Sequence, residues 1–463
     1  MNPCSKNILR AGMRLSGGMF CIVFILFKPG FATEISGLIS TDQTWPAADN
    51  PFIIADNTLV GSGTVLTIEP GVIVKFNKGL TLQINGTLIA RGTSDSTILF
   101  TANSTGDTAG YWRYIHLANA TNAVFSDSLA YQAGTVLEHA VIEYGGGTGS
   151  TGALQTSSCH VFINNVTVRR SATSGIFLGA GGSVVRNSVF ESNASHGIAV
   201  NGAEKTTLKD NASRENNGYG ISFDASGLVM GNIVFKNKGH GISGYCKGGG
   251  FEITRNISMS NGGIGISLDG CIMSVTKNIS ISNASGGIRL MDDGSIASQN
   301  IIAGNSGLAY QGKESCNGNL INSLVYANSS TTHIVFLTSY APTKSFSCNT
   351  VVSNTAPTTI FIAQGCCGGP NAIHQCNIRN NIQHFELSSN FGNATTIRAD
   401  ANWWGTVVDT TIQSRIYDWF DNVDAAVVQY QPVLTEMDTV APISPPDSVV
   451  KSLVEFQKAI MKM

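Results

Sequence analysis

Residues 256–266 read NISMSNGGIGI and residues 278–288 read NISISNASGGI, so the same pattern returns after 22 residues. Outward from this stretch, the dipeptide Gly-Ile recurs at spacings of 22, 23, 21, 24 and 22 residues, beginning at Gly175, Gly197, Gly220, Gly241, Gly265 and Gly287. A series of asparagines runs out of phase with it at a similar period: Asn165, Asn187, Asn211, Asn232, Asn256, Asn278, Asn300 and Asn322. Two independent series with one period indicate a chain built from repeated structural units.

A period near 22 residues fits one turn of a β-solenoid and is too short for a helix-pair repeat or a propeller blade. The short runs after the asparagines, such as Ile-Val-Phe at 233–235, alternate as a strand with one buried face does. We therefore expect an all-β fold of roughly 13 to 15 coils, about 65 to 70 Å long at the spacing of β-strands.

Stacked asparagines have a structural role in such a fold, because their amides can bond one another from coil to coil at the bends. An inward asparagine cannot be glycosylated. We therefore expect most of the N-x-S/T sequons in the repeat to be structural: Asn165, Asn193, Asn211, Asn256, Asn278 and Asn283.

The composition excludes several classes of protein. The 463 residues carry a formal net charge of -2, and only 13% of them are charged. A near-neutral chain without a basic block lacks the electrostatic footprint of a nucleic-acid binder. A hydrophobic content of 42% is too high for a disordered chain, and 51 glycines argue against a coiled coil.

The first 32 residues are expected to be a signal peptide, because Arg10 and Arg14 precede an apolar run at 19–27 and the small-residue pattern Gly-Phe-Ala at 30–32. No later stretch approaches the length of a transmembrane helix. We expect an exported monomer, secreted, extracellular or at the cell surface, with the periplasm as an alternative. Disulfides persist in such compartments.

The repeats at 165–322 resemble those of the right-handed parallel β-helix proteins of the pectate-lyase-like superfamily, of the bacterial secreted or surface type. So do GTVLTIEPGVIVKF at 63–76 and the closing motif NWWGT at 402–406. The resemblance implies a signal peptide at 1–32, a lead-in and cap at 33–60, a right-handed parallel β-helix at 61–434, and a Pro-containing linker with a short tail at 435–463. Residues 439–447 resemble the lead-in to an appended β-sandwich, but only 16 residues follow them.

Three aromatic residues occupy the slot before Gly-Ile on consecutive coils: His196, Tyr219 and His240. They would stack and offer a face for sugar rings, or form an ordinary exposed turn column. Gly-His-Gly at 239–241 also occurs in polygalacturonases, but their other motifs are absent and the repeat explains the glycines. His196 and His240 would lie about 9.6 Å apart, too far to share a metal.

Carboxylates follow the Gly-Ile strands at the position of Asn201: Asp224, Asp269, Asp292 and Asp293. The resemblance implies that such acids could hold Ca²⁺ against a uronate, with Arg289 as the base that removes a proton. The alternative interpretation is that Asn201-Gly202, Asp269-Gly270 and Asp293-Gly294 are ordinary turn dipeptides. We expect no other cofactor.

Cys348 and Cys376 each lie one residue before an asparagine, and we predict a disulfide between them. Three functions stay open. The first is binding of a polysaccharide or a cell-envelope component along the solenoid. The second is a Ca²⁺-dependent lyase or epimerase acting on uronic-acid polymers around Arg289, Asp269 and Asp292. The third is a structural or adhesive surface protein.

Overall fold

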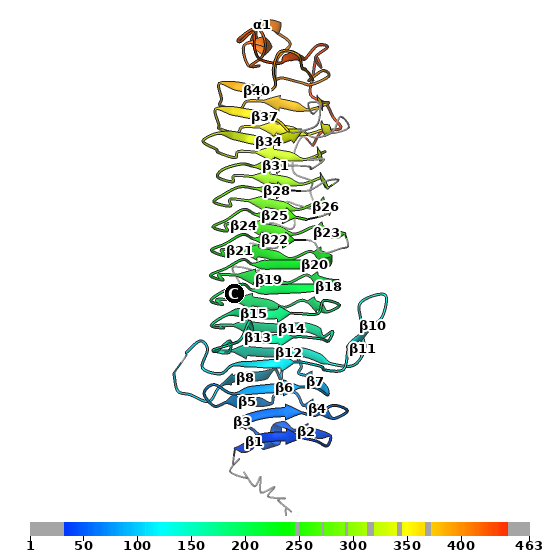
Figure 1. Cartoon of the computed structure of the whole chain (residues 1–463), viewed down its shortest axis with the longest axis vertical. Helices are drawn as coiled ribbons and strands as arrows, with labels where there is room; N and C mark the ends of the chain where they lie inside the picture. The colour runs from blue at the N-terminus through cyan, green and yellow to red at the C-terminus, as the bar shows by residue number, and fades with distance from the viewer. Residues whose placement is uncertain are drawn as a thin grey trace, which may run out of the picture.

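A computed structural model describes residues 32–442 except for 107, 246–249, 271–272, 292–294, 313–318, 340–344 and 366–371. The chain winds into a long rod of stacked coils (Figure 1). The rod is a parallel β-solenoid of about 14 turns with about 23 residues per turn. The fold class and repeat length expected from the sequence are thereby confirmed.

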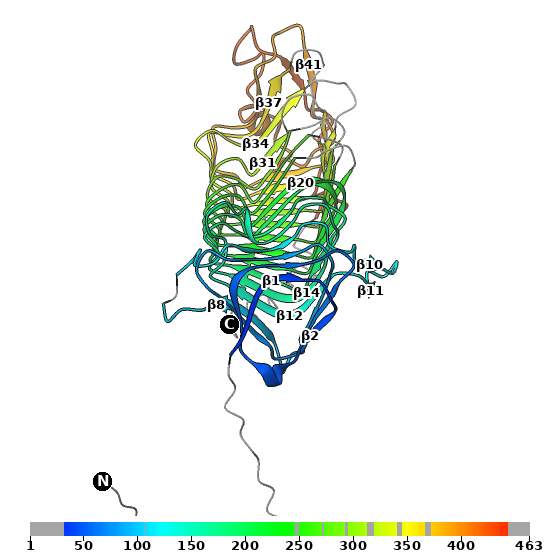
Figure 2. The same ribbon diagram turned by 60° about the horizontal axis from the view of Figure 1, so that its bottom comes forward.

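Each full coil contributes one strand to each of three stacks, here called faces A, B and C in chain order. In one coil these strands are β25 (Ile266–Asp269), β26 (Met273–Thr276) and β27 (Ile279–Ile281). Each pairs in parallel with the equivalent strand of the next coil. Figure 2 shows the strands of successive coils lying over one another.

Face A carries the Gly-Ile pattern. Its strands are β6 (Thr81–Ile84), β9 (Tyr114–Leu117), β13 (Gly152–Thr156), β15 (Ser174–Leu178), the first parts of β18 (Ile198–Lys209) and β20 (Ile221–Met230), β22 (Ile242–Tyr245), β25, β28 (Ile288–Leu290), β31 (Tyr310–Gly312), β34 (His333–Ser339), β37 (Thr358–Gln364) and β40 (Phe385–Ser389).

Face B follows face A in each coil. Its strands are β2 (Gln43–Trp45), β4 (Val65–Ile68), β7 (Thr87–Arg91), the first parts of β12 (Val136–Glu143) and β14 (Phe162–Arg169), β16 (Val184–Arg186), the second parts of β18 and β20, β23 (Phe251–Thr254), β26, β29 (Ile296–Ser298), β32 (Asn319–Ile321), β35 (Ser345–Ser347) and β38 (Ala372–His374).

Face C completes the coil. It is formed by β1 (Thr33–Ile39) and β3 (Phe52–Val60), which also reach face A, and by β5 (Ile73–Phe76), β8 (Ile98–Ala102), the second parts of β12 and β14, β17 (Val189–Glu191), β19 (Ala212–Arg214), β21 (Ile233–Phe235), β24 (Ile257–Met259), β27, β30 (Ile301–Ala303), β33 (Leu324–Tyr326), β36 (Thr350–Val352) and β39 (Asn377–Arg379).

Additional elements lie at both ends of the rod. The first coil includes η1 (Ala47–Asp49), and a hairpin of β10 (Val124–Phe125) and β11 (Tyr131–Ala133) projects from the side (Figure 2). The last coil is followed by β41 (Thr396–Arg398), α1 (Asp409–Gln413) and β42 (Val427–Gln429). Trp404 is 1% exposed and belongs to the same core cluster as Ile412 of α1. The predicted signal peptide and the last 21 residues lie outside the described range.

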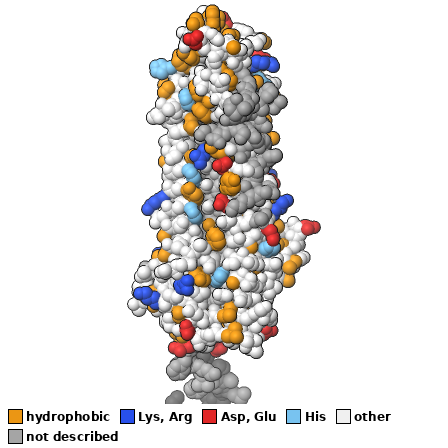
Figure 3. Space-filling model, viewed as in Figure 1, with side chains coloured by type: hydrophobic (Ala, Val, Ile, Leu, Met, Phe, Trp, Pro, Cys, Tyr) orange, Lys and Arg blue, Asp and Glu red, His pale blue; other side chains and the backbone are white. Residues whose placement is uncertain are grey.

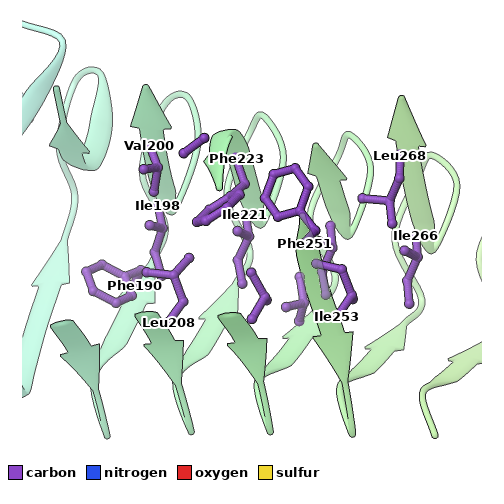
Figure 4. Packing of buried hydrophobic residues seen from close by; sticks show 14 of the residues in the cluster. Phe190, Ile198, Val200, Leu208, Ile221, Phe223, Phe251, Ile253, Ile266 and Leu268 are labelled. Carbon is purple, nitrogen blue, oxygen red and sulfur yellow. The ribbon is translucent and has the colours of Figure 1, made fainter. Parts of the chain in front are cut away.

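The core fills the space between the faces. The isoleucines of the Gly-Ile series lie in direct register, from Ile176 through Ile198 and on to Ile288. Figure 4 shows these side chains meeting phenylalanines and leucines from the opposite strands, among them Phe190 and Leu208. Each coil therefore buries the apolar side that it cannot bury alone.

The glycines of the series are required by the close approach of face C. Ser258 lies inward on β24, and its Oγ donates a hydrogen bond of 2.7 Å to the carbonyl oxygen of Gly265. A Cβ atom on Gly241 would lie 2.0 Å from Ser258 Oγ, and one on Gly197 would lie 2.0 Å from Ser213 Oγ. No larger residue fits these positions without displacing its neighbour.

Two buried ladders run along the bends, one at each end of face C. In the first, Asn256 Nδ2 donates to Asn278 Oδ1 over 3.0 Å and to the carbonyl oxygen of Val229 over 2.8 Å. The second ladder lies five residues later in the chain, and sequence analysis did not identify it. Its members are Asn193, Asn216, Asn237, Asn261, Asn283, Asn305, Asn328, Asn354 and Asn381.

The strand register shows that three asparagines of the predicted series do not lie in the ladder. Asn165, Asn187 and Asn322 precede the first ladder and have positive φ angles of 54°, 50° and 48°. The inward positions belong to the residues after them, such as Ser188 and Ser323. The residue before each position of the first ladder thus has a left-handed backbone conformation, which asparagine tolerates well. The other five sequon asparagines are buried as expected, whereas Asn165 is exposed.

The predicted disulfide between Cys348 and Cys376 is wrong, because both are free thiols. Ser347 pairs with His374, which places Cys348 opposite Gln375 rather than opposite Cys376. The Cys376 thiol faces the interior and donates to the carbonyl oxygen of Phe346 over 3.5 Å, in the first ladder. The cysteines at 246, 271, 316, 366 and 367 lie outside the described residues.

Candidate functional site

The rings of His196, Tyr219 and His240 form a continuous stack at the edge where the chain enters face A. The centroids of His196 and Tyr219 are 4.9 Å apart at an interplanar angle of 27°, and those of Tyr219 and His240 are 5.0 Å apart at 17°. All three side chains are partly exposed. The structure therefore brings together the three residues that the repeat placed in one slot.

Backbone hydrogen bonds fix the two imidazoles. The Tyr219 backbone N–H donates to His196 Nδ1 over 2.9 Å, and the Ile264 N–H donates to His240 Nδ1 over 2.8 Å. Because Nδ1 is the acceptor, the ring proton of the neutral imidazole lies on Nε2.

Burial lowers the pKa of both histidines below the ordinary value of 6.5. For His196 the nearby Asp224 partly opposes this shift, and for His240 the Arg289 cation adds to it. The two rings are therefore neutral near pH 7, and each keeps a donor at Nε2.

A row of small outward side chains lies beside the stack on face A. Ala199 pairs with Ser222, Ser222 with Ser243, and Ser243 with Ser267 on successive coils. Larger residues stand at the two ends of this row, Phe177 before Ala199 and Arg289 after Ser267. This row of small residues runs parallel to the rod axis, and together with the edges on its two sides it is here called the trough of face A.

The opposite edge of the trough carries polar side chains. Asn201 is in register with Asp224, and Tyr245 is in register with Asp269. Tyr245 is 50% exposed. The predicted acidic positions Asp224 and Asp269 therefore lie on this edge, whereas Asp292 and Asp293 are outside the described residues.

One end of the trough widens into a groove of about 420 Å³. Phe177, Ala199 and Ser222 line its floor, and His196 and Asp224 stand on its two sides. Figure 3 shows this face of the rod, with histidines in a row and acidic and basic side chains beside them. A hydroxyl-rich ring could there meet an aromatic face and a carboxylate together.

Arg289 lies in the outward row of face A, in register with Ser267 of the preceding coil. Its Nε and Nη2 donate to Ser267 Oγ over 3.0 and 2.7 Å. Asp269 lies two residues after Ser267 on β25, so strand alternation directs both side chains outward, Ser267 in the row of small residues and Asp269 on the polar edge.

A second aromatic group lies further along face A and was not identified from the sequence. His333 stacks on Phe361 with centroids 4.3 Å apart, and Phe336 lies 5.7 Å from Phe361. Phe336 and Phe361 occupy the outward row of Arg289, after Gln311. Counting the coils beyond the last Gly-Ile dipeptide would have predicted that these two phenylalanines lie in the outward row.

Within the described ranges, no three or more histidine, cysteine, aspartate or glutamate side chains form a group that could hold a metal ion. The same part of the chain contains no helix that is long and apolar enough to cross a membrane.

Comparison with known proteins identifies the repeat. Residues 151–306 match the family described as "Right handed beta helix region". An 80-residue stretch is 39% identical to the Protein bark beetle of Drosophila melanogaster; it covers 17% of this chain and 2% of that protein. The chain thus corresponds to a small part of this relative's length.

The solved structures that are similar to this chain share little sequence identity with it and have low TM-scores. The DFA-IIIase from Arthrobacter chlorophenolicus A6 in complex with GF2 has a TM-score of 0.32 and 14% identity, over 81% of this chain and 89% of that one. The Azotobacter vinelandii mannuronan C-5 epimerase AlgE4 A-module has a TM-score of 0.28 and 11% identity, over 88% and 91%. The receptor binding domain of the siphovirus 9NA tailspike has a TM-score of 0.26 and 11% identity, over 77% and 72%.

Proposed function

We propose that this right-handed parallel β-helix protein is exported and binds an extended polysaccharide along the trough of face A. One observation carries the proposal. A floor of small residues lies between a stack of three aromatic rings and an edge of amide, carboxylate and phenol groups.

The chemistry of the two edges suits a sugar chain. Sugar rings have apolar C–H faces that pack on aromatic rings, and their hydroxyls bond to carboxylates and amides. His196 and His240 add Nε2 donors, and Asp224 adds acceptors opposite them.

The geometry of the trough suits a polymer. From Phe177 to Arg289 the outward row crosses five coil steps, about 24 Å at the spacing of paired strands. A regular backbone repeat presents similar groups at each step, so an extended chain parallel to the rod axis can use several of them at once.

A second function is supported by Arg289, a cation at the end of the row of small residues, one coil after the edge residue Asp269. This pair fits the Ca²⁺-dependent lyase or epimerase reaction on uronic-acid polymers, in which acids hold the ion and Arg289 removes the proton next to the carboxyl group. Asp292, which the sequence assigns to the same site, lies outside the described residues.

A panel of extended polysaccharides, neutral and uronic, tests both functions. Residues 33–463 should be retarded in gels containing at least one of the polymers, and the variant Tyr219→Ala should lose most of this retardation. Tyr326→Ala is the matched control, because Tyr326 is an exposed tyrosine on face C. Equal retardation of both variants would refute binding in the trough. The absence of retardation by every polymer, neutral or uronic, would refute polysaccharide binding.

Ultraviolet absorbance of the unsaturated product, followed with and without Ca²⁺, separates binding from elimination. A Ca²⁺-dependent rise that Arg289→Ala abolishes would establish the lyase. Incorporation of deuterium from deuterated water into the polymer would reveal an epimerase, which forms no unsaturated product. If the protein is retarded by a polymer but neither the absorbance rise nor the isotope exchange is seen, binding remains as the function.

A further inference from the structure

The second aromatic group of face A lies on the line of the trough. His333 stands two residues before the inward Val335 of β34. His240 stands likewise two residues before the inward Ile242 of β22. The two inward residues are joined in register through the intermediate coils, at Ile266, Ile288 and Tyr310. The edge that holds the stack therefore continues to His333, four coil steps or about 19 Å further along the rod. Figure 1 shows these face A strands, from β22 to β34, one above another.

The outward row of the trough reaches the same aromatic group. After Arg289 this row runs through Gln311 to Phe336 and then to Phe361. The residues on either side of the two phenylalanines belong to the core: Val335, Leu337, Ile360 and Ile362. Strand alternation therefore directs both phenylalanine rings outward, and both are partly exposed.

The three rings form one apolar surface. The centroids of His333 and Phe361 lie 4.3 Å apart at an interplanar angle of 11°, and Phe336 lies 5.7 Å from Phe361 and 6.0 Å from His333. Burial lowers the pKa of His333 below the ordinary value of 6.5, so its imidazole is neutral near pH 7. Flat, neutral rings of this kind pack well against the C–H face of a sugar.

The stacking of the coils does not require aromatic residues in this row. Most of its earlier positions hold small or polar residues, although the strands there pair in the same way: Ala199, Ser222, Ser243, Ser267 and Gln311. Adjacent outward phenylalanines leave apolar surface in contact with water that serine would not. Contiguous exposed apolar surface is typical of a binding site.

We propose that His333, Phe336 and Phe361 form a second sugar-binding subsite, so that one polysaccharide chain contacts both the stack and the second aromatic group. This inference rests on the proposed function, because its occupant is the polymer of the trough. The continuity of both rows favours this occupant: a chain that follows the trough past Arg289 and Gln311 arrives at the three rings. Two contacts on one polymer act as a bivalent site, which strengthens binding without any further contact.

Titration calorimetry with fragments of different length tests the proposal. The probes are size-fractionated fragments of whichever polyuronate or neutral glucan retards the parent most strongly in gels. Fragments shorter than about 19 Å can contact one aromatic group at a time, whereas longer fragments can contact both. The affinity of the parent should rise at least about tenfold as the fragments exceed this length. An affinity that does not rise there would overturn the proposal.

Substitution of Phe361 shows whether the rise depends on the second aromatic group. Phe361→Leu keeps an apolar side chain but removes the ring, and it should lower the affinity for long fragments about 3- to 10-fold. Phe361→Tyr keeps the ring and should bind like the parent, as should the face C control Tyr326→Ala. An equal loss in Phe361→Tyr would indicate a packing defect in place of a lost sugar contact and would overturn the proposal.

The stack provides the comparison that separates this inference from the proposed function. If Tyr219→Ala weakens the binding of long fragments and Phe361→Leu does not, the second subsite is refuted and binding in the trough stands. If no polymer retards the parent, both are refuted. Sedimentation velocity covers the remaining occupant: a smaller sedimentation coefficient in Phe361→Leu with unchanged affinity would identify a second copy of the chain on these rings and would also overturn the proposal.

Discussion

The phenol ring of Tyr219 lies 5.0 Å from the imidazole of His240 at an angle of 17°, although 21 residues separate them in the chain. One coil of the solenoid accounts for this separation. The stack therefore depends on correct registration of the coils, and its exposed edge is available to a ligand.

Removal of the central ring should weaken polysaccharide binding. We expect Tyr219→Ala to lower the affinity for the bound polymer about 3- to 10-fold, since a stacking contact contributes about 0.5–1.5 kcal/mol. Titration calorimetry with the polymer from the panel measures the effect. Tyr326→Ala on face C should bind like the parent, and an equal loss in this control would contradict the assignment of the trough.

Acid should destabilise the protein through His196 and His240. Burial lowers both pKa values below 6.5, so between the folded pKa and 6.5 the unfolded chain binds more protons. The stabilisation is complete above about pH 6.5 and is lost as the pH falls through the folded pKa values.

Urea denaturation at pH 7.5, 6.5 and 5.5 measures this effect. The free energy of unfolding should fall below pH 6.5, and the fall should be smaller in His196→Gln/His240→Gln, whose amides do not titrate. An identical pH profile in the double variant would show that other groups cause the acid sensitivity.

Loss of one ladder asparagine should destabilise the fold strongly. The Asn256 side chain makes four hydrogen bonds: Nδ2 donates to Val229 O and Asn278 Oδ1, and Oδ1 accepts from N and Nδ2 of Asn232. Asn256→Ala leaves several of these buried partners unsatisfied, which should cost about 2–4 kcal/mol. Urea titration measures it, and the exposed Asn217→Ala should change stability by less than about 0.5 kcal/mol.

A methyl group on a repeat glycine should be poorly tolerated. Gly241→Ala places Cβ 2.0 Å from Ser258 Oγ and 2.6 Å from the carbonyl oxygen of Gly265, so we expect a loss of about 1–3 kcal/mol or more. Gly392→Ala is the control, because the nearest atom to its Cβ would lie 3.7 Å away. Thermal melts compare the two, and equal melting temperatures would refute the steric account.

A second substitution locates the clash of Gly241→Ala. Ser258→Ala removes the nearer atom, so the double variant should lose less stability than the sum of the single variants. Additive losses would show that Ser258 Oγ does not oppose the methyl group.

The amino-acid sequence by itself determined the fold, because every coil repeats the same local requirements. Isoleucine must point inward, glycine must admit the inward serine of face C, and asparagine must bond its neighbour at the bend. A period near 22 residues with these types at fixed positions suits a stack of coils and little else. The same regularity placed His196, Tyr219, His240 and Arg289 in their correct outward slots.

Only the tertiary structure decided features that depend on small changes of register. A difference of one residue separates Asn187, at a left-handed bend, from Ser188 in the ladder, and Cys348 from a position opposite Cys376. Coil lengths vary by several residues, so simple counting along the chain loses the register. The trough edges and the second aromatic group arise between coils, where residues that are far apart in the sequence meet through strand pairing.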